Sequence, residues 1–133
     1  MNAVEPTPHQ LVALQGAADD GPVVMLNLLR FHERAVGIDA SDGITGAEAY
    51  GRYGAGVTAF LARAGGEVLL ALRPEASVIG PEASEWDLVL AVRYPSRAAF
   101  MAMITDPEYL AVHQHRTAGV VDSRLIACAA LTA

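Results

Sequence analysis

The stretch VVMLNLLRF, residues 23–31, decides the fold of this chain. Its apolar side chains occupy both alternating sets of positions, as in a strand that is covered on both faces of a sheet. The preceding residues 19–22, DDGP, break the chain before it. We therefore predict a central strand over residues 23–31, with other elements packed on both of its faces.

Helical spacing of apolar residues follows in two regions. From Gly46 onward, apolar residues recur three and four positions apart until Gly65 ends the pattern. Later, Ser96 offers a cap for one helical segment, and a second segment begins with Asp106 as its cap and ends at Gly119. We predict two main helices, the second of them in two pieces.

The remaining elements are shorter. Three further strands are predicted over residues 67–73, 86–94 and 121–131, and the first two of these should pair as a hairpin. Residues 7–18 begin with a capping box and predict a short N-terminal helix. Residues 33–45 are polar and lack a sustained period, so we expect a loop there that is either a lid or disordered.

The order of these elements selects the topology. Two right-handed crossovers that share one sheet give the ferredoxin-like split βαβ arrangement. This is an α+β fold with a four-stranded antiparallel sheet and both main helices on one face. The other face is left bare although its residues are also apolar, so we expect a second copy of the sheet to cover it. The predicted assembly is a homodimer of the dimeric α/β-barrel kind.

Length and charge exclude several classes of partner. The 133 residues suit a single domain over 1–133. Nine basic residues against fifteen acidic ones give a formal net charge of -6, which disfavours nucleic acid as a partner. No apolar run approaches the ~20 residues of a membrane span, and the start of the chain lacks the pattern of a secretory signal. We expect no membrane partner and a cytoplasmic location.

Several motifs resemble a known family. They are AGGEVL at residues 64–69, RYPS at 93–96 and DPEY at 106–109, with Tyr53 before them and Arg116 after them. In these motifs the chain resembles the DUF1330 family, a domain of unknown function in the dimeric α/β-barrel superfamily, with a family-like core over residues 46–131. The resemblance implies the fold and dimerisation. It does not select an activity, because the superfamily includes cofactor-free monooxygenases, isomerases, haem proteins and ligand sensors.

The chain also departs from the family pattern. Its connection over residues 79–85 is longer than the short step that the family commonly has after its second strand. It also carries the N-terminal helix at residues 7–18 and the long loop at residues 33–45.

A polar residue within the apolar central strand is the first candidate for a binding site. The amide of Asn27 either orients a ligand carbonyl or bonds neighbouring backbone and fixes the strand. Arg30, which alternation places on the opposite face of the strand from Asn27, either binds an anionic substrate or pairs with an acid such as Asp87. Aromatic residues at core spacing either line a cleft or simply fill the core. The predicted pocket lies between sheet and helices and is lined by Asn27, Tyr53, Trp86 and His113, with Arg30 or Arg93 near its mouth and Tyr94 beside Arg93.

The histidines favour acid–base chemistry over metal binding. On a helix His113 and His115 point about 200° apart, so they do not chelate one ion. His113 is the candidate general base, and the alternative is a partly buried histidine bonded to a loop carbonyl, since no acidic partner is evident nearby in the sequence. Cys128 lies in an apolar run and is interpreted as a small buried hydrophobe. We expect neither a metal nor a cofactor.

Two classes of function stay open. One is an enzyme without a tightly bound cofactor, monooxygenase-like or isomerase-like, that acts on a small, mostly apolar metabolite by proton transfer or oxygen insertion. The other is a non-catalytic homodimer that binds a ligand or serves a structural role. The sequence does not decide whether the protein is an enzyme.

Overall fold

The computed structural model describes residues 2–17 and 20–131 of the chain. Its helices are α1 (Pro8–Gln15), α2 (Gly46–Ala64), α3 (Arg97–Ile104) and α4 (Pro107–Gly119), with a short 3-10 helix η1 (Gly37–Asp42). Its strands are β1 (Val23–Phe31), β2 (Glu67–Leu72), β3 (Leu88–Tyr94) and β4 (Val120–Cys128). In this part of the chain no helix is long and apolar enough to cross a membrane.

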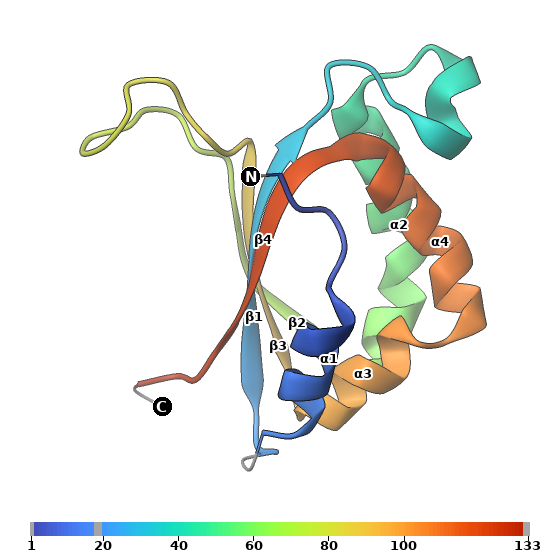
Figure 1. Cartoon of the computed structure of the whole chain (residues 1–133), viewed down its shortest axis with the longest axis vertical. Coiled ribbons are helices and arrows are strands. Elements are labelled where there is room, and N and C mark those ends of the chain that lie inside the picture. The colour runs from blue at the N-terminus through green and yellow to red at the C-terminus, as the bar shows by residue number, and fades with distance from the viewer. Residues whose placement is uncertain (1, 18–19, 132–133) are drawn as a thin grey trace.

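The strands form one antiparallel sheet in the order β2-β3-β1-β4. The predicted central strand is β1, and β2 pairs with β3 as the predicted hairpin. Figure 1 shows α2, α3 and α4 on one side of this sheet, with α1 near its β4 edge. The α+β, ferredoxin-like split βαβ fold is therefore confirmed.

Local sequence explains where the main helices begin and end. Thr45 and Glu48 form a reciprocal capping box at the start of α2, and Gly65 ends that helix in the left-handed conformation with a φ of 74°. At the start of α4 the Asp106 carboxylate accepts the backbone N–H of Glu108, and Pro107 occupies the first turn, where its missing N–H costs nothing.

Strand alternation gives the sheet two different faces. In β1, Val23, Met25 and Leu29 point toward the helices and are almost fully buried. Leu26 and Leu28 lie on the opposite face and are only half-buried. Residues directly opposite each other in an antiparallel pair share a face, so the registers of β3 and β4 extend both faces across the sheet.

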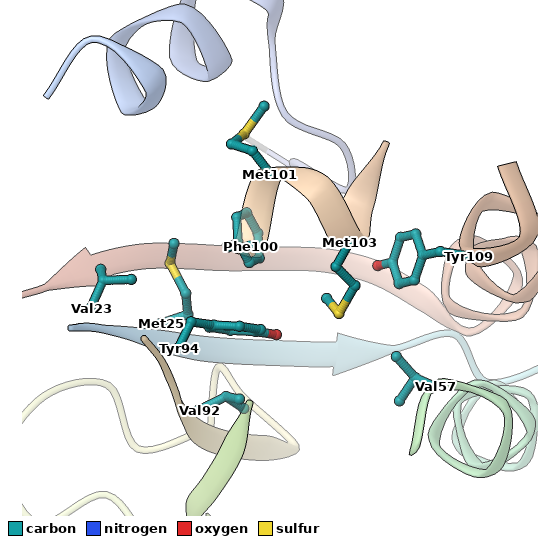
Figure 2. Packing of buried hydrophobic residues seen from close by; sticks show 9 residues of the cluster. All are labelled: Val23, Met25, Val57, Val92, Tyr94, Phe100, Met101, Met103 and Tyr109. Atoms are coloured by element: carbon teal, nitrogen blue, oxygen red, sulfur yellow. The ribbon is translucent and has the colours of Figure 1, made fainter. Parts of the chain in front are cut away.

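The largest core cluster fills the space between the sheet and the helices (Figure 2). Tyr94 and Phe100 meet edge to face with ring centroids 5.1 Å apart, which joins β3 to α3. The buried members of the cluster are Val23, Met25, Val57, Val92, Tyr94, Phe100, Met101, Met103 and Tyr109.

A second contact brings backbone against backbone at the other end of the molecule. The N–H of His32 donates to the carbonyl of Gly119 at 2.8 Å, and the N–H of Gly46 donates to the carbonyl of His32 at 3.1 Å. The end of β1 is thereby tied to the start of α2 and the end of α4. A Cβ atom at Gly46 would overlap the carbonyl groups of His32 and Gly119, and one at Gly119 would overlap the carbonyl group of Gly46.

Some local predictions need correction. Residues 33–45 contain η1 and a fully buried Asp39, so this segment is neither disordered nor free of secondary structure. β3 begins at Leu88 and not at Trp86, because the N–H of Phe31 at the end of β1 donates to the Asp87 side chain and not to a backbone carbonyl. Cys128 is half-buried on the helix-free face, not a buried hydrophobe.

The boundaries of other elements also shift. β2 ends at Leu72, and β4 runs over Val120–Cys128 and not over 121–131. α1 ends at Gln15, and Ala18, where the predicted helix ended, lies outside the described residues.

The connection between β2 and β3 forms an exposed arm over residues 73–87. Figure 1 shows it extending away from the helices, beyond the sheet. Val78 and Ile79 in this arm are 93% and 96% exposed. Among the described residues before Leu131, they are the most exposed large apolar side chains.

Candidate functional site

The structure divides the seven predicted pocket residues between the two faces of the sheet. Asn27 lies on the helix side, in alternation with Met25 and Leu29. Tyr53 and His113 come from the covering helices, and Tyr94 belongs to the core on the same side. By strand register, Arg30 and Arg93 lie on the helix-free face. Trp86 also borders that face, in a hollow that it shares with Arg30.

The residues on the helix-free face bind one another and do not reach the helix side. Arg93 pairs with Glu67 at 2.7 Å. The guanidinium of Arg124 lies 5.4 Å from the centroid of the Trp86 ring. The predicted pocket therefore does not include Trp86, Arg30 or Arg93 beside Tyr53 and His113.

The expected partner of Arg30 also differs. Arg30 lies 3.5 Å from Asp122 of β4 and not beside Asp87. The carboxylate of Asp87 instead accepts the backbone N–H of Phe31 at 2.9 Å.

On the helix side, four side chains form a continuous hydrogen-bonded chain. Nε2 of His113 lies 2.8 and 3.0 Å from the two carboxylate oxygens of Glu5. Nδ1 of His113 lies 3.1 Å from the hydroxyl of Tyr109, and that hydroxyl lies 3.0 Å from the hydroxyl of Tyr53. We call these four residues the Glu5–Tyr53 chain.

The chemistry of each group decides which partner donates in each hydrogen bond of the Glu5–Tyr53 chain. An ionised carboxylate only accepts, so Nε2 of His113 carries the proton that faces Glu5. In the neutral imidazole Nδ1 is then an acceptor, and it takes the hydroxyl proton of Tyr109. The oxygen of Tyr109 in turn accepts from Tyr53. Each donor thus points toward Glu5, and the basic nitrogen of His113 faces the tyrosines.

The carboxylate of Glu5 is held in its ionised form. Partial burial acts to raise the pKa of Glu5, but hydrogen bonds from His113 and from the Thr117 hydroxyl, together with the charge of Arg116, outweigh burial and leave that pKa below its usual value. The Thr117 hydroxyl donates to Glu5 at 2.7 Å. Glu5 therefore supplies the acidic partner that we did not find near His113 in the sequence, because it lies 108 positions away along the chain.

The segment that carries Glu5 crosses from β4 to α4, and we call residues 2–6 the N-terminal strap. The backbone N–H of Ala3 donates to Asp122, and the carbonyl of Ala3 accepts from the Ser123 hydroxyl, both at 2.8 Å. The carbonyl of Val4 accepts from Arg116 at 2.7 Å. Figure 1 shows the strap running from its place beside β4 down to α1.

Burial changes the pKa values of the tyrosines in this region. Burial raises the pKa of Tyr53 well above its usual range, and the neighbouring Tyr109 adds to this effect. Burial raises the pKa of Tyr109 and of Tyr94 as well. These phenols therefore stay protonated near neutral pH and serve as hydroxyl donors and acceptors.

Asn27 makes the backbone contact that we considered as one of its two roles. Its amide Nδ2 donates to the carbonyl of Met25 at 3.2 Å, within the same strand. This contact fits the interpretation of Asn27 as a residue that fixes β1.

The second histidine belongs to a separate cluster. Nδ1 of His115 lies 2.8 Å from the carboxylate of Asp39, and Nη1 of Arg52 donates to the same carboxylate at 2.7 Å. His113 and His115 thus have different acids as partners, in agreement with their predicted divergence. In residues 2–17 and 20–131, no three His, Cys, Asp or Glu side chains are grouped to hold a metal ion.

Two surface hollows lie near these groups. One, of about 280 Å³, lies between η1 and α4, where Ile38 and Ala118 supply apolar wall and His113 and Thr117 supply polar groups. The other, of about 240 Å³, lies on the helix-free face beside Trp86. The first hollow borders the His113 ring, whereas Tyr53, at the far end of the Glu5–Tyr53 chain, does not line it.

Comparison with known proteins identifies a family and structures that are similar over nearly the whole chain. The model of the family described as "Domain of unknown function (DUF1330)" matches residues 40–129. A crystal structure of a protein of unknown function from Rhodopseudomonas palustris is 39% identical, with a TM-score of 0.91, and the match covers 100% of both chains. The methylated form of that protein matches with 40% identity and a TM-score of 0.92, over 98% of this chain and 96% of the other. No curated protein matches.

A more distant likeness shows the fold alone. SnoaB, a cofactor-independent oxygenase from Streptomyces nogalater, is 16% identical with a TM-score of 0.54, over 85% of this chain and 96% of its own. The full coverage of the Rhodopseudomonas palustris protein means that the N-terminal helix and the loop after β1 both lie within that match. Both departures from the family pattern therefore lie in the region of the chain that this solved structure matches.

Proposed function

This chain belongs to the DUF1330 family, and we propose that it is a homodimer that binds a small, mostly apolar molecule and removes a proton from it with His113 as the general base. The proposed chemistry needs no cofactor and is of the isomerase or monooxygenase kind, in which loss of a proton is the first step. The observation that carries the proposal is the Glu5–Tyr53 chain. An imidazole held between a carboxylate and a hydroxyl is the usual arrangement of a histidine base.

The geometry places a carboxylate on the far side of the proposed base. When Nδ1 of His113 takes a proton, the ring becomes a cation, and Glu5 lies against Nε2 to offset that charge. The proton reaches Nδ1 through Tyr109: its hydroxyl gives a proton to His113 and accepts one from Tyr53, whose oxygen takes the proton of the bound molecule. High phenol pKa values favour such a concerted relay over a free tyrosinate.

A general-base probe tests this proposal without knowledge of the natural substrate. With 5-nitrobenzisoxazole, which opens when a base removes its ring proton, we expect the protein to exceed the rate of free imidazole. His113→Gln keeps a polar side chain of similar reach but has no basic nitrogen, so we expect it to lower this rate by about a hundredfold. The measurement is the absorbance of the phenol product over time.

His115→Gln is the matched control, because His115 lies on the same helix but bonds Asp39 on another side. We expect it to retain the rate of the unchanged protein. Equal rates for His113→Gln and the unchanged protein, or no rate above that of imidazole, would show that His113 is not a general base.

The homodimer is supported by the chemistry of the helix-free face. Its exposed side chains include Leu70, Leu72 and Ile126, which are 42%, 54% and 46% exposed in the single chain. A self-complementary contact between two such faces needs to bury about 1,600 Å² to be stable. The covered face would also enclose Cys128.

We predict that light scattering at micromolar concentration gives twice the mass of the 14.0 kDa chain. Ile126→Glu places a charge in the proposed contact and should shift the protein to monomers, because an unpaired charge in an apolar interface is costly. Leu110→Glu is the control, since Leu110 has similar exposure, 48%, but lies on α4. A stable monomer of the unchanged protein would contradict the dimer.

A further inference from the structure

The guanidinium of Arg116 is buried without an acid beside it. Arg116 lies in α4 and is only 8% exposed. Among the described residues it forms no ion pair, although eight pairs are present around other side chains. Its charge helps to lower the pKa of Glu5, but the Glu5 carboxylate is bound by His113 and Thr117. A buried cation without a direct counter-charge costs free energy, which a bound anion would offset.

The groups around Arg116 are donors that face the N-terminal strap. Arg116 and Ser123 donate to the carbonyl oxygens of Val4 and Ala3, at 2.7 and 2.8 Å. Arg116 also lies 3.4 Å from the Ser123 hydroxyl, so these two donors are adjacent. Successive oxygen atoms of the strap thus occupy a short row of donors that α4 and β4 supply. A neutral carbonyl is a weaker partner for a guanidinium than a carboxylate, which accepts two parallel N–H bonds.

An aromatic wall adjoins this row of donors. Val4, whose carbonyl accepts from Arg116, is followed by Glu5, and Glu5 lies 2.8 Å from His113. His113 in turn lies 3.1 Å from the hydroxyl of Tyr109, and the charge of Arg116 also acts on Tyr50, Tyr53 and Tyr109. The rings of Tyr50 and Tyr53 lie 5.4 Å apart between centroids, and those of Tyr53 and Tyr109 lie 6.3 Å apart. A guanidinium and hydroxyl donors next to such rings suit a flat apolar molecule with one carboxylate.

We propose that Arg116 and Ser123 form a binding site for the carboxylate of a small aromatic acid, and that the N-terminal strap occupies this site in the free protein. The carboxylate replaces the carbonyl oxygens of Ala3 and Val4, and the strap moves away as the acid enters. This inference goes beyond the proposed function, because release of the strap also takes Glu5 away from His113. The acid is therefore a regulator that switches off the proposed general base, and not its substrate.

Benzoate serves as the probe, with the full chain labelled with ¹⁵N. As benzoate saturates the site, we expect the amide signals of residues 3–5 to move to positions typical of flexible peptide, while the signals of α4 stay dispersed. Arg116→Met should weaken benzoate about tenfold through loss of the charge-assisted bonds. Glu5→Gln should tighten it about threefold, because a strap held less firmly by His113 competes less.

Two controls separate this site from general attraction of anions. Arg73→Met removes an equal charge from an exposed position that is 83% accessible, and it should leave benzoate affinity unchanged. Benzamide, which is neutral and of the same shape, should bind about tenfold more weakly than benzoate. If Arg116→Met does not fold, as judged by circular dichroism, Ser123→Ala takes its place with an expected loss of about threefold.

The proposal is overturned if benzoate binds Arg116→Met, or Ser123→Ala in its place, as well as it binds the unchanged protein. It is also overturned if the strap signals stay in place at saturation, or if Glu5→Gln binds benzoate no more tightly than the unchanged protein does. The titration involves no turnover, so its result is independent of the nitrobenzisoxazole assay. Strap release without base activity would support the carboxylate site and contradict the proposed catalysis. Base activity without strap release would support the proposed catalysis and contradict the carboxylate site.

Discussion

Gly119→Ala is expected to lower the free energy of unfolding by roughly 3 kcal/mol or more. A Cβ atom at Gly119 would overlap the carbonyl oxygen of Gly46 and lie 3.0 Å from the backbone nitrogen of Tyr50. Both neighbours are backbone atoms of the first turns of α2, so no side-chain rotation relieves the contact. The end of α4 and the start of α2 would have to separate, and with them the hydrogen bond between His32 and Gly119. Urea unfolding followed by circular dichroism measures the change.

Gly51→Ala is the control for this prediction. Gly51 lies in the interior of α2, and no atom lies within 4 Å of a Cβ built there. Alanine at such a position should stabilise the protein by about 0.5 to 1 kcal/mol, because glycine loses more backbone freedom on folding. If both variants change stability by similar small amounts, the close approach of Gly46 and Gly119 does not constrain the fold.

Asp39→Asn should cost about 3 kcal/mol of stability, although it changes no volume. The carboxylate of Asp39 is 1% exposed, and it accepts from both Arg52 and His115. An amide has only one oxygen, and its NH₂ group would point a donor at one of these two donors. The loss would loosen the contact that holds η1 against α2 and α4. Thermal or urea unfolding near pH 7 measures the difference.

Asp42→Asn is the matched control because Asp42 pairs with the same Arg52 at 2.6 Å but is 46% exposed. Solvent screens such a pair, and we expect the change to cost less than about 1 kcal/mol. Equal losses for the two variants would show that the burial of Asp39 does not matter.

The effect of Asp39 should also depend on pH. Burial acts to raise the pKa of Asp39, but the hydrogen bonds from His115 and Arg52 outweigh it, so the pKa in the folded protein lies below its ordinary value of 3.8. The carboxylate therefore contributes stability above pH 3.8, and the contribution is lost as the pH falls through the lower folded value. The difference between the unchanged protein and Asp39→Asn should accordingly shrink on acidification below that point.

Most of the fold was predictable because its signals are local. The apolar run of residues 23–31, the capping box that begins at Thr45 and the Asp106-Pro107 start of α4 all act within a few positions of the chain. The order of the elements then leaves few topologies. The loop after β1 was not predictable in this way, because η1 is held by Asp39 through partners 13 and 76 positions away.

The candidate site was only partly predictable for the same reason. His113 and Tyr53 were identified from their helical positions, and the structure joins them through Tyr109. The acid that completes this chain comes from Glu5, and nothing in the sequence around His113 points to the N-terminal strap. The sequence predicts Trp86 and Tyr53 in one aromatic wall, as aromatic residues on a strand and on the helix that faces it, but it does not show which face of the sheet Trp86 borders. The register of β1 and β4 instead brings Arg124 and the adjacent Trp86 ring to the opposite face.

The position of the N-terminal strap determines how knowledge gained on this protein transfers to its relatives. The family model matches residues 40–129, but the acid that orients His113 is Glu5. A homologue that aligns only over the matched segment would inherit the imidazole and the tyrosines without their carboxylate. Its activity, if assigned by family membership, would then be attributed to an incomplete set of groups. The protein from Rhodopseudomonas palustris, which matches over its full length, is the first relative in which the same chemistry is worth measuring.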